Sequence, residues 1–506
     1  MINNGGFTGG GGYAYVRDRL GVVSVKDFGA KGDGVTDDTA AIQAAIDYLG
    51  SIGGGKCVFP GGTYVISESI TISYSDIALE GATTFNPTIQ PNGSFDAIVL
   101  SGGISGTRIA NLAISPSVTQ TSGAGISADS TGNAVYTTLI ENVYFATYDG
   151  IRLYNTNTTS ILHCRMNCSH YGLYCGSGCT IVRFTNAEVG GGTAGVFLDG
   201  GCASIKMEQL EIFTSQYGVA IDTVNGGSAP SYIYMYEVEC NLAGTQSSNA
   251  IFFYINDADE VHLTECWCDG GPQAIQINSG TVTILGGRFG DGNSPIIGIA
   301  GGNSTTIVGS SIAGSPGTST GIAITGGGNI RIQDCIFGLF GDALTYAVTV
   351  SSAYTGVYGV SAGSVNGNLL IAGCSMGHTV YQKGNGYDIQ CAAGLVTIVD
   401  TFGANPYGAI TPPASPFVSG TVYQNTTPVP ITIYQPAYAS TSGTAGSVAV
   451  ALGSTSTPST LYTDLVDAGT TSTSPRVLPA LRVPPGWYYS FTATGATLAD
   501  AMIQGE

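Results

Sequence analysis

The sequence predicts an all-β chain whose larger part is a right-handed parallel β-helix (solenoid), with a short N-terminal capping helix and a small C-terminal β-sandwich. Three observations predict this fold class: a glycine-rich composition, a loose repeat of 21 to 28 residues, and two short alternating apolar segments in each repeat. A repeat architecture also accounts for a length of 506 residues, which exceeds the usual size of one compact domain.

The composition narrows the partners that the chain can have. Glycine contributes 76 residues, and only 10% of residues are charged, against about 25% in an average protein. With 43% hydrophobic residues, the chain does not have the composition of a disordered protein. A formal net charge of −19 argues against binding nucleic acid, and no apolar run is long enough to span a bilayer. A neutral glycan stays compatible, and we expect no cofactor.

The N-terminal part of the chain has two sections. Residues 1–21 are rich in glycine, lack the apolar stretch of a secretory signal, and predict a flexible segment that could attach to a particle. Residues 22–66 predict a cap, in which a short strand (22–25) precedes a helix that Asp37 or Asp38 begins. The apolar positions of this helix have helical spacing and are Ile42, Ala45, Ile46 and Leu49.

The repeat extends the predicted β-helix over residues 22–404. The first apolar segment of each repeat closes on an apolar residue, and these closing residues are Phe145, Met166, Val189, Ile212, Cys240, Cys268, Phe289, Ile312 and Phe337. Side chains alternate between the two faces of a strand, so the closing residues and the residues two positions earlier point inward. The second segment follows at 150–153, 172–175, 195–198, 218–221, 250–253, 274–277 and 321–324.

This register explains many of the 12 cysteines. Five of them fall at inward positions and are expected to be small core residues: Cys164, Cys240, Cys266, Cys268 and Cys335. An alternative is a zinc site built from Cys164, Cys168, Cys175 and Cys179 with His163 and His170. Because Cys164 and Cys175 are both expected to point inward, we favour the core interpretation and predict no metal.

The C-terminal part of the chain loses the repeat. Residues 405–420 are rich in proline and predict a linker. Residues 421–506 contain short alternating segments separated by Ser, Thr and Gly, which predicts a small β-sandwich.

The segment DFGAKGDGVTDDTAAIQAAID (27–47), followed by GGGKCVFPGGTYVI (53–66), closely resembles the opening of pectate-lyase-superfamily β-helix proteins, which include viral tailspikes and polysaccharide depolymerases. The resemblance implies that this segment forms the cap and first turns of the helix, with structural roles for Asp33, Asp37 and Asp38. It transfers no catalytic residue. For a tailspike it further implies a homotrimer in the virion, an N-terminus that contacts other tail proteins, and a C-terminal domain for trimerisation or receptor binding.

Outward positions of the repeat form columns with a spacing of about 4.8 Å between strands. The column just before the closing residues reads Tyr144, Arg165, Glu188, Glu211, Glu239, Trp267 and Arg288. The column two positions earlier reads Asn142, His163, Asn186, Gln209, Glu237 and Glu265. We expect the two columns to lie side by side on one face, which gathers five glutamates in a chain that has few acidic residues.

A glycosidase needs a carboxylic acid beside a carboxylate, and neighbouring glutamates can supply both. Adjacent rungs give a separation near the roughly 5 Å of a retaining enzyme, and alternate rungs, at about 9.6 Å, approach the range of an inverting enzyme. We predict Glu211, Glu237 and Glu239 as catalytic candidates. The substrate-binding candidates are Glu188, Glu265, Trp267, Tyr144, His163, Arg165 and Arg288.

Other interpretations of these carboxylates stay open. The glutamates could be a solvated ladder or could bind Ca²⁺. A second column on the next sheet contains Asp199 and Asp222 with Tyr154, Tyr254 and Asn278, and turn-capping is the better explanation for its two aspartates.

The sequence therefore predicts a viral tailspike that hydrolyses a host surface polysaccharide outside the cell. One alternative is a non-catalytic adhesion spike that binds a host glycan or glycoprotein in the same groove. A second alternative is a polysaccharide lyase, which needs a basic residue to remove a proton. The acidic patch argues against a lyase, because the nearest lysine in the sequence is Lys206.

Overall fold

The structure, a computed structural model, describes three parts of the chain. The first is residues 21–337 without 84–85, 130–131, 215, 243–248, 269–270, 293–294 and 315–319. The second consists of the strand segments 346–350, 368–372, 375–376, 389–391 and 395–399. The third is residues 417–505 without 427–429, 441–443, 467–475 and 499–501. The expected N-terminal segment 1–21 and linker 405–420 lie outside the described residues, apart from residues 21 and 417–420.

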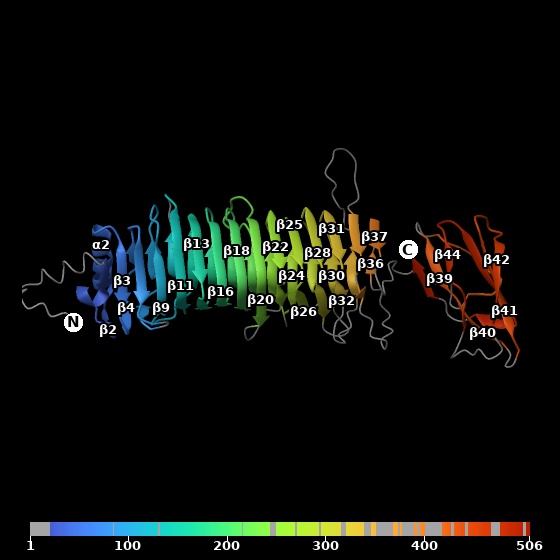
Figure 1. The fold of residues 1–506 in the computed structure, drawn as a ribbon, viewed down its shortest axis with the longest axis horizontal. Coiled ribbons are helices and arrows are strands. Elements are labelled where there is room, and N and C mark those ends of the chain that lie inside the picture. Colours follow the sequence, from blue (N-terminus) through green and yellow to red (C-terminus); the bar gives the residue numbers. More distant parts are fainter. Residues whose placement is uncertain are drawn as a thin grey trace, which may run out of the picture.

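The repeat forms a parallel β-helix in which each turn of chain adds strands to three faces (Figure 1). The first and second faces together make a 24-stranded sheet that bends at a corner, and the third face is a 13-stranded sheet. All strand pairings within these two sheets are parallel, for example β16 with β18 and β17 with β19. The fold class predicted from the sequence, a right-handed parallel β-helix, is confirmed.

The strands divide among the faces as follows. The first face contains β1 (Val22–Ser24), β3 (Gly55–Phe59), β6 (Ile77–Gly81), β13 (Thr156–Leu162), β22 (Glu260–Thr264), β25 (Thr281–Leu285), β28 (Ser304–Val308), β31 (Asn329–Gln333), β34 (Asn368–Ala372) and β37 (Leu395–Val399). The second face contains β2 (Asp33–Asp37), β4 (Thr63–Ile66), β7 (Thr88–Pro91), β14 (Arg165–Asn167), β23 (Trp267–Cys268), β26 (Arg288–Gly292), β29 (Ser311–Gly314), β32 (Ile336–Phe337) and β35 (Ser375–Met376). Five long strands run through both faces: β9 (Arg108–Ile114), β11 (Val135–Phe145), β16 (Thr180–Gly191), β18 (Ala203–Thr214) and β20 (Ser231–Leu242). The third face contains β5 (Ile70–Ile72), β8 (Ile98–Leu100), β10 (Ala124–Asp129), β12 (Asp149–Tyr154), β15 (Tyr171–Cys175), β17 (Ala194–Leu198), β19 (Tyr217–Ile221), β21 (Ile251–Ile255), β24 (Gln273–Ile277), β27 (Ile297–Ile299), β30 (Thr320–Ile324), β33 (Tyr346–Val350) and β36 (Ile389–Cys391).

From β9 to β32, the corner between the first and second faces contains at least one residue with left-handed backbone angles in each turn. The left-handed residues of this corner other than glycine have φ between 49° and 56°. They are Asn111, Asn142, His163, Asn186, Gln209, Glu237, Glu265 and Asp334. This backbone region is unfavourable for most L-residues and is best tolerated by Gly, Asn and Asp. The left-handed residue bends the chain, so two consecutive side chains, that of the corner residue and that of the residue before it, point outward. We call this row of corner residues the ridge.

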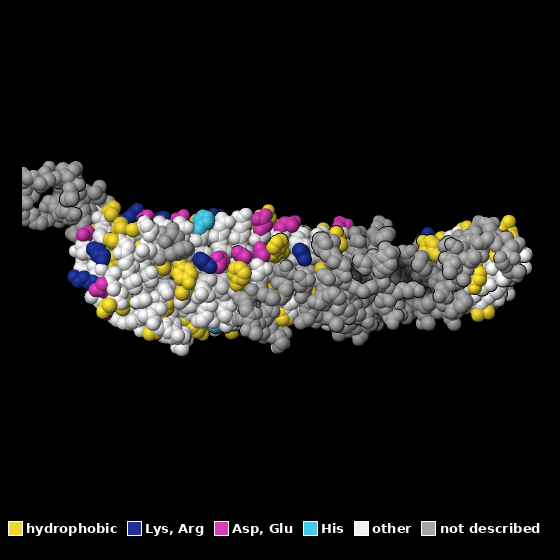
Figure 2. All heavy atoms as spheres, turned by 90° about the horizontal axis from the view of Figure 1, so that it is seen from below, with side chains coloured by type: hydrophobic (Ala, Val, Ile, Leu, Met, Phe, Trp, Pro, Cys, Tyr) yellow, Lys and Arg dark blue, Asp and Glu magenta, His cyan; other side chains and the backbone are white. Residues whose placement is uncertain are grey.

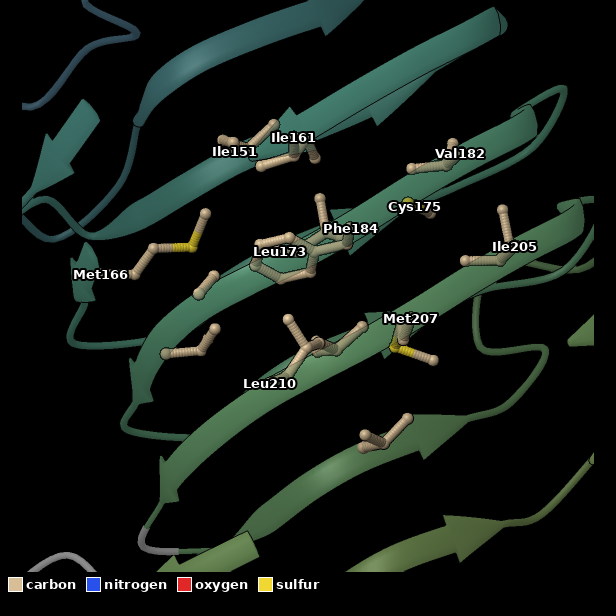
Figure 3. Packing of buried hydrophobic residues seen from close by; sticks show 14 of the residues in the cluster. Ile151, Ile161, Met166, Leu173, Cys175, Val182, Phe184, Ile205, Met207 and Leu210 are labelled. Carbon is tan, nitrogen blue, oxygen red and sulfur yellow. The ribbon is translucent and has the colours of Figure 1, made fainter. Parts of the chain in front are cut away.

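Apolar side chains fill the interior of the β-helix in continuous columns (Figure 3). The closing residues predicted from the repeat lie opposite one another from Phe145 to Phe337 and are all at most 2% exposed. The five cysteines predicted to be core residues are buried as well. Each fully buried apolar side chain of this size contributes about 1.5–3 kcal/mol, so the columns are the main source of stability.

The N-terminal cap covers one end of this core. The first strand, β1, ends at Ser24, and a 3-10 helix, η1 (Val25–Phe28), follows it. Helix α2 (Thr39–Ser51) buries the four apolar residues predicted from its spacing. The carboxylate of Asp37 accepts a hydrogen bond from the Thr39 amide at 3.0 Å. The carboxylate of Asp38, at the N-cap position, instead accepts bonds from the amides of Lys31 and Gly32, at 2.6 and 2.8 Å. In the described ranges, no helix has the length and apolar character needed to cross a bilayer.

The C-terminal residues form three antiparallel sheets that share one hydrophobic core, including Ile433, Val450 and Phe491. The four-stranded sheet contains β38 (Val422–Gln424), β41 (Gly446–Gly453), β42 (Ser459–Val466) and β45 (Tyr488–Thr494). The two three-stranded sheets contain β39 (Ile431–Tyr434), β44 (Leu481–Val483) and β47 (Met502–Gly505), and β40 (Pro436–Ala439), β43 (Arg476–Val477) and β46 (Ala496–Leu498). The expected role of this part in trimerisation or receptor binding stays a prediction.

Candidate functional site

The second face presents the predicted outward column in unbroken register. Its members lie directly opposite one another on successive strands, in the order Tyr144, Arg165, Glu188, Glu211, Glu239, Trp267 and Arg288. Figure 2 shows this face, where acidic side chains follow one another in a line with basic side chains beyond each end. We call this row the glutamate column.

The ridge holds the other predicted column, which includes His163, Glu237 and Glu265. We expected both columns to lie side by side on one face, and the structure places the second column at the corner that borders this face. The left-handed backbone places the ridge residues at the corner, so their side chains border the first and second faces together. Glu237 accepts a hydrogen bond from the Gln209 amide, with 3.0 Å between Nε2 and Oε2. Bonding to Glu237 raises the pKa of Tyr236, the residue before the corner.

The carboxylates of the glutamate column have different partners. Glu188 pairs with Arg165 at 3.0 Å, and their side chains are 42% and 56% exposed. Glu239 accepts a hydrogen bond from the Asn241 amide at 2.6 Å. Glu211 is exposed and has no hydrogen bond or ion pair with another described residue. The three stacked carboxylates are therefore chemically distinct: one neutralised by a cation, one hydrogen-bonded, and one open to solvent.

A groove of about 790 Å³ lies on the same face. Its lining includes three members of the glutamate column, Tyr144, Arg165 and Glu188. Smaller side chains floor its N-terminal end, where Thr63, Thr88 and Ala113 continue the column in register. The groove therefore follows the column as far as Glu188, and a bound chain lying in it would extend toward Glu211, the next member of the column.

The structure adds contacts beside the ridge that the sequence did not indicate. Lys206 and Glu208 form an ion pair at 2.6 Å on the first face, beside the ridge. Tyr234 and Tyr236 are 41% and 42% exposed on the same face, and the Tyr234 ring stacks on His262 at 4.9 Å. The sequence signal for these contacts is the asparagine that recurs at the corner position. A corner there makes the side chain of the preceding residue point outward, which places Glu208 and Tyr236 on the surface.

The second column considered in the sequence lies on the third face, where the turn-capping interpretation of its aspartates is confirmed. The carboxylate of Asp199 is buried and accepts hydrogen bonds from the amides of Gly200 and Asn225 at 2.7 and 3.3 Å. Burial acts to raise the pKa of Asp199, but these bonds and one from the Tyr174 hydroxyl outweigh it and lower the pKa. Asp222 accepts a bond from the Thr223 amide at 2.8 Å.

The cysteines and histidines considered for zinc do not converge. Cys164 donates to the carbonyl oxygen of Leu162 in the core, His163 is exposed on the ridge, and His170 pairs with Asp149 on the third face. Across the described ranges, no group of three or more His, Cys, Asp or Glu side chains is arranged to hold a metal ion.

The fold and this surface define a parallel β-helix protein with a polar groove and an aromatic-flanked row of carboxylates on one outer face. The family model "Rhamnogalacturonase A/epimerase, pectate lyase-like" matches residues 22–241. This match and the parallel β-helix support the resemblance to pectate-lyase-like proteins that the sequence implied.

Two curated proteins illustrate the sequence similarity. The chain is 64% identical over 44 residues to "Mannuronan C5-epimerase AlgE1" of Azotobacter vinelandii, a match that covers 9% of this chain and 3% of that protein. It is 43% identical over 105 residues to "Probable glucan endo-1,3-beta-glucosidase" of Arthroderma benhamiae, covering 19% and 11%. The chain thus matches only a small part of the length of either relative.

Two solved structures are also similar. One is the surface adhesin PfbA of Streptococcus pneumoniae, with 17% identity, coverage of 64% of this chain and 93% of that chain, and a TM-score of 0.46. The other is the tailspike protein of an Acinetobacter phage, with 13% identity, coverage of 96% and 88%, and a TM-score of 0.37.

Proposed function

We propose that this protein is a viral tailspike that binds a host surface polysaccharide along the second face and hydrolyses it with a pair of carboxylates. The observation that carries this proposal is the glutamate column itself. Three carboxylates stand in register on consecutive strands between Tyr144 and Trp267, and the groove adjoins them.

Binding of a sugar chain rests on the two ends of the column. Trp267 is 46% exposed, so its flat ring is available to stack on a sugar face. Tyr144 and Arg165 line the groove at the other end and offer an aromatic ring and hydrogen-bond donors. A polysaccharide lying in the groove and reaching Trp267 passes over Glu188, Glu211 and Glu239.

The chemical roles follow from the partners of each carboxylate. The Asn241 amide donates to Glu239 and fixes the direction of its carboxylate, which suits a nucleophile. Glu211 has no such donor among the described residues, so its side chain can turn toward the glycosidic oxygen, and we assign it the role of proton donor. In this scheme Glu211 gives its proton to the glycosidic oxygen while Glu239 attacks the anomeric carbon. Water then releases the sugar, and its proton returns to Glu211.

The remaining predicted residues would assist. Arg165 forms an ion pair with Glu188, and this pair would position the substrate. Glu237 and Glu265, on the ridge, border the scissile region from the other side, and Glu237 is the second candidate for the proton donor.

The assembly part of the proposal rests on the family resemblance. It includes a homotrimer, attachment to other tail proteins through residues 1–21, a role for residues 421–506 in holding chains together, and action outside the host cell.

A second candidate function is a non-catalytic adhesin that binds a host glycan or glycoprotein. The exposure of the glutamate column favours it, because glycosidases usually keep the acid in a less hydrated environment that holds its proton. A polysaccharide lyase has less support, because the one cation of the groove lining, Arg165, is already paired with Glu188.

Product analysis by mass spectrometry tests the proposal. The protein is incubated with host surface polysaccharide beside Glu211→Gln, Glu239→Gln and the control Glu68→Gln, which changes an exposed glutamate in the N-terminal turns. We expect discrete oligosaccharides from the parent and the control, and a rate about 10²–10⁴-fold lower from the two column variants. Binding without cleavage by the parent would establish the adhesin, and unsaturated products would establish the lyase.

A further inference from the structure

The third face carries an aromatic surface on the outside of the β-helix. It consists of Tyr148, Tyr154, Tyr171, Tyr174, Phe197, Tyr217 and Tyr254, which we call the aromatic terrace. Ala194 lies between Tyr171 and Tyr217 in register, and Ala220 lies between Phe197 and Tyr254. Both alanines are fully buried, so the larger side chains close over them and make the terrace continuous.

The rings of the terrace lie in similar orientations. Tyr174 and Phe197 are 5.7 Å apart with 9° between their planes, and Tyr217 and Tyr254 are 4.9 Å apart at 24°. Tyr171 stacks on Tyr174 at 5.6 Å and 29°. Tyr174 and Phe197 are only 5% and 8% exposed, so the rings that a sugar can reach are the partly exposed ones of Tyr171, Tyr217 and Tyr254.

Carboxylates already bind the basic side chains beside the terrace. Arg152 donates to both carboxylate oxygens of Asp96 at 2.7 Å and lies 3.5 Å from Asp149. His170 contacts Asp149 at 2.9 Å and stacks on Tyr148 at 4.7 Å. Among the described residues beside the terrace, Arg152 and His170 are thus already paired with carboxylates, so neither is available to an anionic ligand.

Uncharged hydrogen-bonding groups border the other end of the terrace. Asn278 donates to Asn256 at 2.7 Å, Asn256 donates to Asp222 at 2.8 Å, and Gln276 donates to Asn278 at 2.8 Å. Gln276 lies opposite Tyr254 on β24, and the partly buried Asn256 and Asn278 directly follow the ends of β21 and β24. Amide groups fixed next to aromatic rings are suited to hydroxyl groups that project from a stacked sugar.

We propose that the aromatic terrace is a second glycan-binding site that holds a neutral oligosaccharide against the third face without cleaving it. The sugar faces stack on Tyr171, Tyr217 and Tyr254, and the amides of the adjoining strands bind its hydroxyls. Tyr171 and Tyr217 are two strands apart, about 9.6 Å, so a chain aligned with the helix axis contacts both. This site is separate from the second face and does not depend on hydrolysis there.

The test is binding to a printed array of neutral and anionic oligosaccharides, made in a background that disables the second face (Glu211→Gln, Glu239→Gln and Trp267→Ala). We expect neutral glycans to stay bound in this background. Adding Tyr217→Ala or Tyr254→Ala should weaken binding at least tenfold, whereas Tyr217→Phe, which keeps the ring, should not. Tyr136→Ala is the matched control, because Tyr136 is an exposed tyrosine, 47% accessible, on the first face.

Several results would overturn this inference. They are loss of all neutral glycan binding in the disabled background, binding of anionic glycans alone, and equal binding by the terrace variants and the control. Sedimentation velocity separates a further alternative: a lower oligomeric state of Tyr217→Ala and Tyr254→Ala would make the terrace a contact between copies of the chain. Cleavage at the second face is measured separately, so failure of the hydrolysis proposal leaves this test intact.

Discussion

Glu211 lies directly opposite Glu239 on neighbouring parallel strands of the second face, so their backbones are one strand spacing apart, about 4.8 Å. Neither side chain sets this spacing, because it comes from the hydrogen bonds between β18 and β20. Two carboxylates held in this way repel each other, and the protein keeps them at its surface, where water screens the charges.

The spacing predicts the stereochemistry of hydrolysis. Carboxylates on adjacent strands match the roughly 5 Å separation of a retaining glycosidase, so we expect the first product to keep its anomeric configuration. Time-resolved proton NMR of the anomeric signals measures this. An inverted product would instead assign the chemistry to carboxylates two strands apart, namely Glu188 and Glu239.

The exposed tryptophan on the second face should carry part of the binding energy. We expect Trp267→Ala to weaken polysaccharide binding about tenfold, or ~1.4 kcal/mol, through loss of the stacking surface. Affinity electrophoresis in polysaccharide gels measures the change. Trp487→Ala is the control, because Trp487 is 37% exposed in the C-terminal part. If the gel retarded the Trp267→Ala and Trp487→Ala variants equally, Trp267 would not be part of the binding site.

Four of the described cysteines should be unreactive in the folded protein. All ten described cysteines are buried, and burial raises the pKa of Cys57, Cys164, Cys168 and Cys266 to about 12. Thiolate is the reactive form, so iodoacetamide at pH 8 should leave these residues unlabelled until guanidinium unfolds the chain. Peptide mass spectrometry identifies each site. Rapid labelling of Cys164 without denaturant would contradict its placement in the core.

Acid should reveal the role of Asp33 in the cap. Hydrogen bonds from Thr36 and Val35 lower its pKa from 3.8 to about 2. A lowered folded-state pKa stabilises the fold above the unfolded value, and this contribution disappears as the pH falls through about 2. We therefore expect Asp33→Asn to have a lower Tm than the parent at pH 5 and the same Tm near pH 1.5. A constant difference in Tm across this range would contradict the assignment.

The core should be intolerant of cavities. Phe184 is fully buried in the interior of the β-helix, so Phe184→Ala should destabilise the protein by about 3–5 kcal/mol. Guanidinium unfolding followed by circular dichroism measures the loss. Tyr136→Ala, at an exposed position, should stay within about 0.5 kcal/mol of the parent.

The interior of the fold was predictable because apolar residues mark it at every turn. Phe145, Val189 and Ile212 could be aligned by hand, and the order of the glutamate column followed from that alignment. The corner was missed because Glu237 and Glu265 adopt a backbone angle that their residue type does not signal. The sequence therefore predicts the strand on which each glutamate lies. It does not predict which way the glutamate side chain points relative to the corner.

The aromatic terrace could not be predicted for a different reason. Its contacts join residues from successive turns, such as Tyr174 with Phe197, whose separation in sequence varies with the length of each turn. A stacking geometry also depends on side-chain rotamers, which a pattern of residue types does not specify. The individual tyrosines were visible in the sequence, but their assembly into one surface was not.

The parallel register of this β-helix has one more consequence. Residues inserted in the turns lengthen loops without moving the strands, so functional groups along a face can be separated only by whole multiples of one strand spacing. A ligand whose own repeat matches such a multiple meets equivalent contacts at every period, and a ligand with another repeat drifts out of phase after a few units. The strand spacing therefore selects polymers by the length of their repeating unit, and this selectivity should increase with the length of the ligand.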